Sequence, residues 1–214
     1  MAQVIAVNVV HALIPGAKGT NLTAIDKRPQ PGRIAVTELG LVGDSHQYRR
    51  HGGPDQALYL YAREDADWWA AQLDREIPSG YFGENLDSIG LDVSNALIGE
   101  RWRIGTGADA VEVEVRSPRT PCRNFAFRMA VPGWTRRFAH ARRPGAYLKV
   151  LRTGRIGAGD PVSVLFQPDH DVSVGDCAFD PSPERMARML DSGIDLMPAI
   201  RELAERVSGR STAS

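Results

Sequence analysis

The sequence predicts a mainly β fold with some α-helix, in which a β-rich domain is followed by a small helical extension. Short apolar runs separated by glycine and proline fill the first three quarters of the 214-residue chain, and such a succession is typical of a barrel or a strongly bent sheet. After residue 168 the apolar residues take helical spacing instead. We therefore expect a β domain over residues 1–168 and a helical extension over residues 169–214.

Seven segments show the strand pattern. In the clearest of them, Val111, Val113 and Val115 alternate with charged residues, as on a strand with one buried face. The glycine-rich segment 153–160 is predicted to be a loop between the last two strands. The expected strands span residues 4–10, 33–36, 57–61, 97–104, 111–115, 146–151 and 162–166.

Helical spacing marks four segments, two inside the β domain and two after it. Trp68 and Trp69 lie in the first segment, and because tryptophans bury a large area we expect them in the core. Ser182 precedes Pro183, which is the favoured order of an N-cap and a first helical position. The expected helices span residues 64–73, 134–142, 183–190 and 198–207.

The composition is that of an ordinary soluble protein. The 26 basic and 26 acidic residues leave no net charge, so the overall balance favours neither nucleic acid nor an acidic membrane surface as a partner. No apolar run approaches the roughly 20 residues of a membrane helix. Cys122 and Cys177 lie far apart in the sequence, which argues against a structural disulfide and fits a reducing cytosol. We expect a cytoplasmic protein that binds neither a membrane nor nucleic acid.

Cys122 is distinguished by the residues around it. Pro118 and Pro121 fix the backbone φ and remove two hydrogen-bond donors directly after a predicted strand, so the strand must end and we expect Cys122 on a stiff loop. Arg119 and Arg123 are close in sequence, and nearby cations favour the thiolate, which is the form that acts as nucleophile and metal ligand. The residues alone leave two interpretations open, a reactive cysteine and a buried structural one.

Two further loops carry polar side chains. His51 stands before a tight turn of two glycines and a proline, where it either lines a pocket or bonds the backbone of the turn. Glu84 and Asn85 offer a carboxylate and an amide, which either orient a ligand or bond their own loop.

In their order along the chain, several short motifs resemble the MOSC domain family, in its bacterial YiiM-like branch. The resemblance runs from about residue 4 to residue 166, and the tail from about residue 171 is similar to a three-helix extension in that branch. The family often has a lysine at the position of Asn124. The motifs are Thr23-Ala24-Ile25-Asp26-Lys27, Gly43-Asp44, His51-Gly52-Gly53-Pro54-Asp55, Phe82-Gly83-Glu84-Asn85-Leu86, Ile98-Gly99-Glu100-Arg101-Trp102, Pro118-Arg119-Thr120-Pro121-Cys122 and Gly145-Ala146-Tyr147-Leu148.

The resemblance implies a MOSC-type β-barrel that binds the molybdenum cofactor, a pterin whose dithiolene sulfurs hold molybdenum. Cys122 is then expected to be the protein ligand to the metal, and a soft thiolate suits such a sulfur-rich centre. Lys27 and Arg119 are expected to meet the anionic groups of the cofactor. Arg123 and Asn85 are the other expected cofactor-binding residues.

The activity that the resemblance implies is the reduction of N-hydroxylated compounds, such as hydroxylaminopurines. Cys122 and His51 are the expected catalytic residues, Cys122 as metal ligand and His51 as a source of protons on the substrate side. No flavin, nicotinamide or iron–sulfur motif is visible, so electrons are expected from a partner redox protein. Two other functions remain open: a non-catalytic carrier of molybdenum cofactor or sulfur, and a cysteine hydrolase in which the thiolate attacks a carbonyl.

Overall fold

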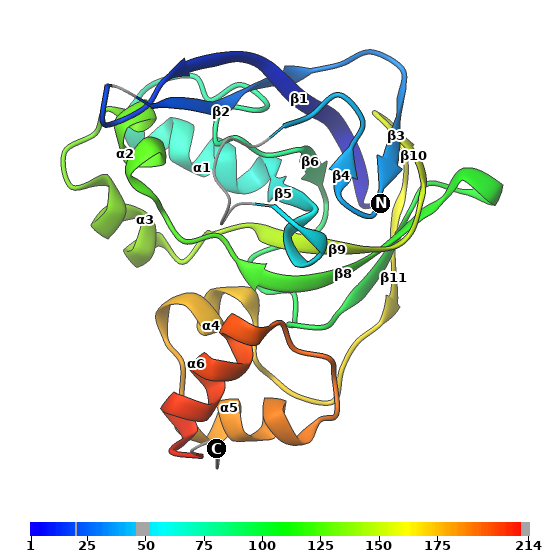
Figure 1. Ribbon diagram of the computed structural model, residues 1–214, viewed down its shortest axis with the longest axis vertical. Coiled ribbons are helices and arrows are strands. Elements are labelled where there is room, and N and C mark those ends of the chain that lie inside the picture. The colour runs from blue at the N-terminus through cyan, green and yellow to red at the C-terminus, as the bar shows by residue number, and fades with distance from the viewer. Residues whose placement is uncertain (20, 46–51, 211–214) are drawn as a thin grey trace.

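The computed structural model describes residues 1–19, 21–45 and 52–210, and its centre is a large β-sheet (Figure 1). The strands are β1 (Gln3–Pro15), β2 (Leu22–Pro29), β3 (Arg33–Thr37), β4 (Gly40–Leu41), β5 (Leu58–Ala62), β6 (Leu86–Ile89), β7 (Arg101–Ile104), β8 (Val111–Pro118), β9 (Ala146–Arg152), β10 (Gly154–Gly157) and β11 (Val162–Phe166). The helices are α1 (Arg63–Leu73), α2 (Arg123–Met129), α3 (Trp134–Ala141), α4 (Val174–Phe179), α5 (Pro183–Asp191) and α6 (Pro198–Ser208).

Eight strands form one open sheet, so the expectation of a closed barrel is wrong. Their order is β11-β7-β8-β9-β5-β6-β1-β2, with β11 and β2 at the two ends, and a second sheet has the order β10-β3-β4. Strand periodicity indicates which residues face a core. It does not indicate whether the end strands meet, because closure depends on tilt and stagger accumulated over the whole sheet. The fold is therefore mixed α and β around one large sheet.

An aromatic cluster packs between the sheet and the helices α1, α2 and α3. The ring centroids of Trp69 and Trp134 are 4.5 Å apart, and Phe138 stacks on Trp69. Phe82 and Phe125 meet edge to face beside them. These five side chains are at most 1% exposed, so the expectation that tryptophan belongs to the core is confirmed for Trp69. Large buried rings of this kind fix where the three helices lie on the sheet.

Most predicted elements are present, and the exceptions have physical reasons. Residues 154–157, predicted to lie in a loop, form β10, which pairs with β3. The two glycines of β10 have no strand propensity, so this strand depends on its partner. The helices α2 and α4 were not predicted because their 7 and 6 residues are too few to show a helical period. Ser182 caps α5 and Pro183 begins it, as predicted.

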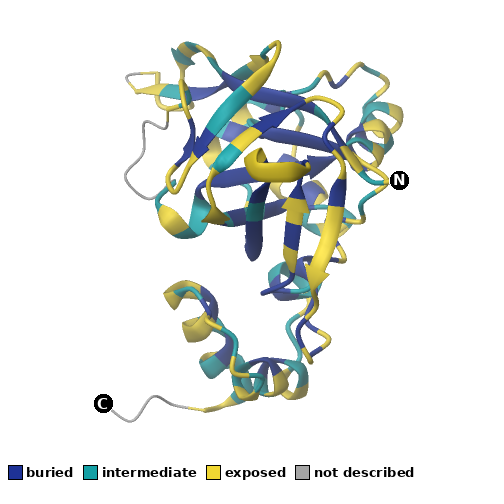
Figure 2. Cartoon of the chain, turned by 90° about the vertical axis from the view of Figure 1, so that its right-hand side faces the viewer, coloured by how far each residue is buried: buried dark blue, intermediate teal, exposed yellow. Residues whose placement is uncertain are grey.

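Three helices follow β11, and their apolar side chains join the core of the sheet. Met186 and Met189 of α5 and Ala204 of α6 are fully buried in the same apolar cluster as Val115 of β8. Figure 2 shows buried residues in these helices as well as in the sheet, whereas β11 is largely exposed. The helices and the sheet thus share one continuous core. A domain boundary at residue 168 stays a prediction.

The polar face of β8 is buried as well, which the alternation of residues did not predict. Glu114 and Arg116 are 4% and 3% exposed. Arg116 donates hydrogen bonds to Glu114 and to Asp195, which lies just before α6. The C-terminal segment therefore covers the polar face of β8. The sequence pattern had predicted that this face is exposed to solvent.

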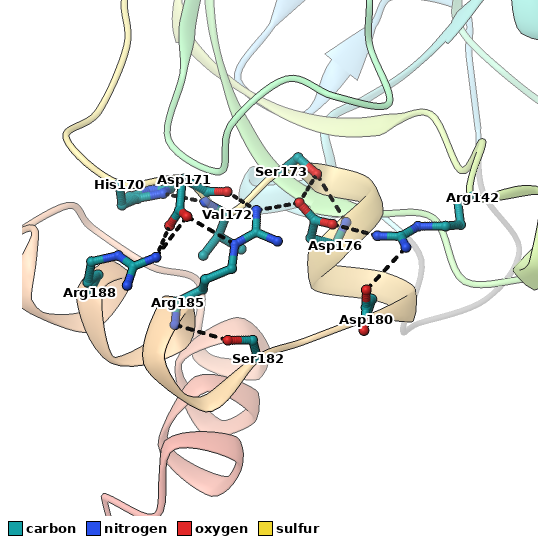
Figure 3. Close-up of polar contacts among 10 residues, drawn as sticks. All are labelled: Arg142, His170, Asp171, Val172, Ser173, Asp176, Asp180, Ser182, Arg185 and Arg188. Atoms are coloured by element: carbon teal, nitrogen blue, oxygen red, sulfur yellow. Dashed lines mark hydrogen bonds and ion pairs between the residues drawn. The ribbon is translucent and has the colours of Figure 1, made fainter.

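An ion-pair group connects α3, α4 and α5 (Figure 3). Asp176 in α4 accepts hydrogen bonds from Arg142, at the end of α3, and from Arg185 in α5. The Ser173 hydroxyl donates a further bond to Asp176 at 2.7 Å, and Arg142 also bonds Asp180 at 3.2 Å. Partial burial raises the pKa of Asp176, but the bonds from Arg185 and Ser173 outweigh that effect and lower the pKa. Asp176 is therefore ionised at neutral pH.

Replacing Asp176 with asparagine is expected to loosen the junction between α3 and α5. The variant loses the charge that both arginines share, and we expect a loss of about 1 kcal/mol in the free energy of unfolding at pH 7. Because the folded pKa of Asp176 is lowered, its contribution is present above about pH 4 and disappears as the pH falls through the folded pKa. Hydrogen exchange of the α4 and α5 amides at pH 7 measures the effect. Exchange at the wild-type rate would contradict it.

In the described part of the chain, no helix is long and apolar enough to cross a lipid bilayer.

Candidate functional site

Cys122 lies where β8 turns into α2. β8 ends at Pro118, and Cys122 is the N-cap residue of α2 with an extended backbone (φ −95°, ψ 170°). The expected stiff loop is therefore a connection of only a few residues. The thiol is partly exposed and packs against the edge of the aromatic cluster. Cys177, in contrast, is buried in α4, and burial raises the pKa of its thiol to about 12. Cys122 is thus the cysteine available for chemistry.

Arg119 is a buried cation beside Cys122. Its guanidinium lies 4.9 Å from the ring centroid of Tyr59 and 4.1 Å from that of Phe125, and it donates a hydrogen bond to the Phe82 carbonyl oxygen. Burial lowers the pKa of Arg119, but electrostatic interactions with tyrosines and with the Cys122 thiol outweigh burial and raise it. The arginine stays charged and fixed, so a positive charge stands near the thiol before any ligand binds.

Lys27 and Asn85 meet at Asp44. The Lys27 Nζ is 2.6 Å from Asp44 Oδ2, and Asn85 Nδ2 donates to the same oxygen at 2.8 Å. Asp44 Oδ1 accepts a hydrogen bond from the Val10 amide at 3.0 Å. Asn85 Oδ1 accepts one from the Tyr59 amide at 3.1 Å. The two predicted cofactor-binding residues are therefore brought together, and Asp44 is the residue that holds them.

Glu84 is buried close to this group. Its loop can approach β2 because Gly80, with φ +81°, has no side chain: a Cβ there would lie 2.3 Å from the Lys27 carbonyl oxygen. Glu84 Oε1 accepts a bond from the Gly80 amide, whereas Oε2 is buried without a hydrogen-bond partner among the described residues. Burial, with the nearby carboxylate of Asp87, raises the pKa of Glu84. Glu84 bonds its own loop, which is one of the two roles that the sequence left open.

Replacing Glu84 with glutamine is expected to reduce the loss of stability at rising pH. The folded pKa of Glu84 lies above its unfolded value near 4.3, so its contribution to stability is full below about pH 4 and is lost as the pH rises through the folded pKa. Within that window the wild type loses about 1.4 kcal/mol per pH unit through this group. Urea unfolding between pH 5 and pH 9 should show a shallower decline for the variant, with the exposed Glu38→Gln as control. Parallel curves would contradict the prediction.

The remaining predicted residues lie apart from this group. Arg123 is exposed on α2 and forms no ion pair in the described part of the chain. His51 lies outside the described residues. Asn124, at the position where the resemblance suggested lysine, accepts a hydrogen bond from the Ala17 amide at 3.0 Å through Oδ1. Asn124 therefore ties α2 to the turn after β1.

Tyr147 was not predicted as a site residue, although it lies close enough to Cys122 for the two side chains to interact electrostatically. It lies on β9 opposite Ser117 of β8, and its ring centroid is 5.1 Å from that of Tyr59. Burial raises the pKa of the Tyr147 phenol, and the electrostatic effect of Cys122 adds to this. The phenol keeps its proton at neutral pH and can donate a hydrogen bond. Its only signal in the sequence was a place in the last of the seven motifs.

A cavity of about 630 Å³ lies elsewhere and contains none of the predicted site residues. Both arginines of its lining are already paired, because Arg143 bonds Asp65 and Arg142 bonds Asp176. Among the described residues no group of three or more histidine, cysteine or carboxylate side chains is arranged to hold a metal ion.

The sequence model of MOSC domains matches residues 47–163, which is more than half of the chain. The chain belongs to the MOSC domain family. It is 31% identical over 160 residues to the protein YiiM of Escherichia coli, a match that covers 73% of this chain and 69% of YiiM. It is 33% identical over 157 residues to a protein of Gibberella moniliformis named "Reductase". This match covers 72% of this chain and 28% of the fungal protein. The chain therefore spans little more than a quarter of that relative.

The fold of this MOSC chain agrees with a solved structure over nearly its whole length. The crystal structure of YiiM from Geobacillus stearothermophilus superposes with a TM-score of 0.76 and covers 96% of this chain and 98% of its own, at 24% identity. The MOSC assignment and the YiiM-like branch suggested by the sequence motifs are thus confirmed.

Proposed function

We propose that this MOSC protein binds the molybdenum cofactor through Cys122 and reduces N-hydroxylated compounds with electrons from a partner protein. One observation carries the proposal: the partly exposed cysteine of a MOSC chain begins α2 beside a buried, charged Arg119. A partly exposed cysteine sulfur is a soft ligand of the kind that suits a sulfur-coordinated metal.

The residues around Cys122 fit such a cofactor in part. Cys122 offers the metal ligand, and Arg123 is an exposed cation for an anionic group. Lys27 is paired with Asp44, so an anion that reaches it competes with that carboxylate. Arg119 is engaged with the Phe82 carbonyl oxygen. We therefore propose that Arg119 places a positive charge near the Cys122 thiol and does not bind the phosphate of the cofactor.

When bound, the molybdenum cofactor supplies two-electron redox chemistry to the site. In the overall reaction the N–O bond of the substrate breaks, an N–H bond forms and the oxygen leaves as water. Two electrons come from the donor protein, and two protons come from solvent by way of His51, the proposed proton donor. Tyr147 donates a hydrogen bond to the polar group of the substrate.

Reduction of 6-hydroxylaminopurine by dithionite-reduced methyl viologen tests the proposed activity. The protein is purified from a host that makes the cofactor, and we expect viologen oxidation with one adenine formed per two electrons. Bound molybdenum without turnover would contradict the reductase and point to a carrier of the cofactor. A reactive Cys122 thiol without bound molybdenum would contradict both and point to the hydrolase.

A further inference from the structure

Charge is strongly segregated along this electrically neutral chain. The whole sequence has 26 basic and 26 acidic residues, but residues 115–159 contain no aspartate or glutamate. This segment includes the end of β8, the helices α2 and α3, and β9. Its basic residues are Arg116, Arg119, Arg123, Arg128, Arg136, Arg137, Arg142, Arg143, Lys149, Arg152 and Arg155.

Carboxylates from other segments neutralise some of these cations. Arg128 pairs with Asp26 at 3.0 Å, and Arg142 and Arg143 pair with carboxylates of α4 and α1. Within the described ranges Arg123, Arg136 and Arg137 form no ion pair, and all three are exposed. The helices α2 and α3 therefore carry three exposed arginines that no carboxylate of the described chain neutralises.

An exposed aromatic side chain lies on the same pair of helices. The helices α2 and α3 lie next to each other on the left side of Figure 1, and both bury aromatic residues in the same cluster. In α2 the buried Phe125 and Met129 leave Phe127 on the opposite side, where it is 58% exposed. Aromatic and arginine side chains are among the residues enriched at protein interfaces.

We propose that the α2–α3 surface, formed by Phe127, Arg136 and Arg137, is the docking site of an acidic electron-donor protein. The proposal rests on the proposed reductase function. The surface adjoins the proposed metal ligand, because Cys122 is the N-cap residue of α2, the helix that carries Phe127. A donor bound there is brought next to the redox centre.

Charge complementarity selects an acidic protein as the occupant. The exposed charges of Arg136 and Arg137 steer a negatively charged partner and set its orientation. Small, transient contacts are typical of redox encounters. Nucleic acid is the weaker alternative, because two exposed arginines supply few of the phosphate contacts on which affinity for nucleic acid depends.

Binding of two acidic electron carriers, a flavodoxin and a [2Fe–2S] ferredoxin, tests this surface. The variants are Arg136→Glu with Arg137→Glu, and as a control Arg201→Glu with Arg206→Glu on α6, which changes the net charge equally. Calorimetric titration should give a dissociation constant at least about tenfold higher for the α3 variant than for the wild type, and one within about twofold of the wild type for the control. For the wild type itself, the dissociation constant should rise at about 0.5 M salt. Phe127→Ser should weaken binding about fivefold.

The outcomes separate the docking surface from the reductase function. Binding of neither carrier by the wild type, or equal loss in the α3 and α6 variants, would overturn the docking surface. Tighter binding of single-stranded DNA with the same dependence on Arg136 and Arg137 would replace the protein partner by nucleic acid. Molybdenum content measured on the same samples reports on the reductase function independently of carrier binding.

Discussion

Cys122→Ala is expected to abolish the viologen-driven reduction of 6-hydroxylaminopurine. Cys122 is the accessible thiol, and Arg119 holds a positive charge beside it. Changes of residues that merely support a metal ligand cost 10–100-fold in affinity or activity, so we expect the loss of the ligand itself to cost roughly 100-fold or more. The measurement is the rate of viologen oxidation per chain.

Cys177→Ala is the matched control, because it removes the other cysteine of the chain. Cys177 is buried in α4, and its raised pKa keeps it a thiol. This variant should keep the wild-type rate and lose about 1 kcal/mol of stability from the small cavity. Equal activity of the two variants, whether both active or both inactive, would contradict the role of Cys122.

Among the substitutions considered, Arg116→Met is expected to cause the largest loss in the free energy of unfolding. Arg116 is 3% exposed and bonds Asp55 at 2.9 Å, Glu114 and the segment around Asp195. Without it, Arg101, at 2.8 Å, is the one counter-charge that the buried Glu114 keeps among the described residues. Removal of one partner of a buried ion pair costs about 3–5 kcal/mol, so we expect about 3 kcal/mol in urea unfolding at pH 7.

Arg103→Met is the control for removing an arginine from a strand in this sheet. Arg103 of β7 is exposed and pairs with Glu112 at 3.0 Å on the surface, where an ion pair contributes about 0.5 kcal/mol. Similar losses in the two variants would mean that the polar group around Arg116 does not hold the C-terminal helices to β8.

The local features of the chain could be predicted from sequence. Val111, Val113 and Val115 are all buried as their alternation required, and α5 begins at its predicted cap. The end of β8 at Pro118 could be predicted because proline fixes φ and removes a donor in its own backbone, independently of the rest of the fold. Predictions of this kind depend on neighbouring residues alone.

Long-range arrangement could not be predicted in the same way. The open sheet depends on pairings such as β1 with β6, between segments far apart in the chain. Lys27 and Asn85 are brought together at Asp44 only in the folded chain. The position of Tyr147 near Cys122 depends on the register of β8 with β9. A single sequence contains no direct signal of strand register across such distances.

Molybdenum and pterin content of the wild-type protein tests the central claim most directly. The protein is purified from a host that synthesises the cofactor, and metal is measured by elemental analysis while the pterin is measured by fluorescence after oxidative release. We predict one molybdenum and one pterin per chain in the wild type and in Cys177→Ala, and neither in Cys122→Ala. Wild-type protein from that host without molybdenum and pterin, or a Cys122→Ala variant that retains both, would contradict the assignment of Cys122 as the ligand of a molybdenum cofactor.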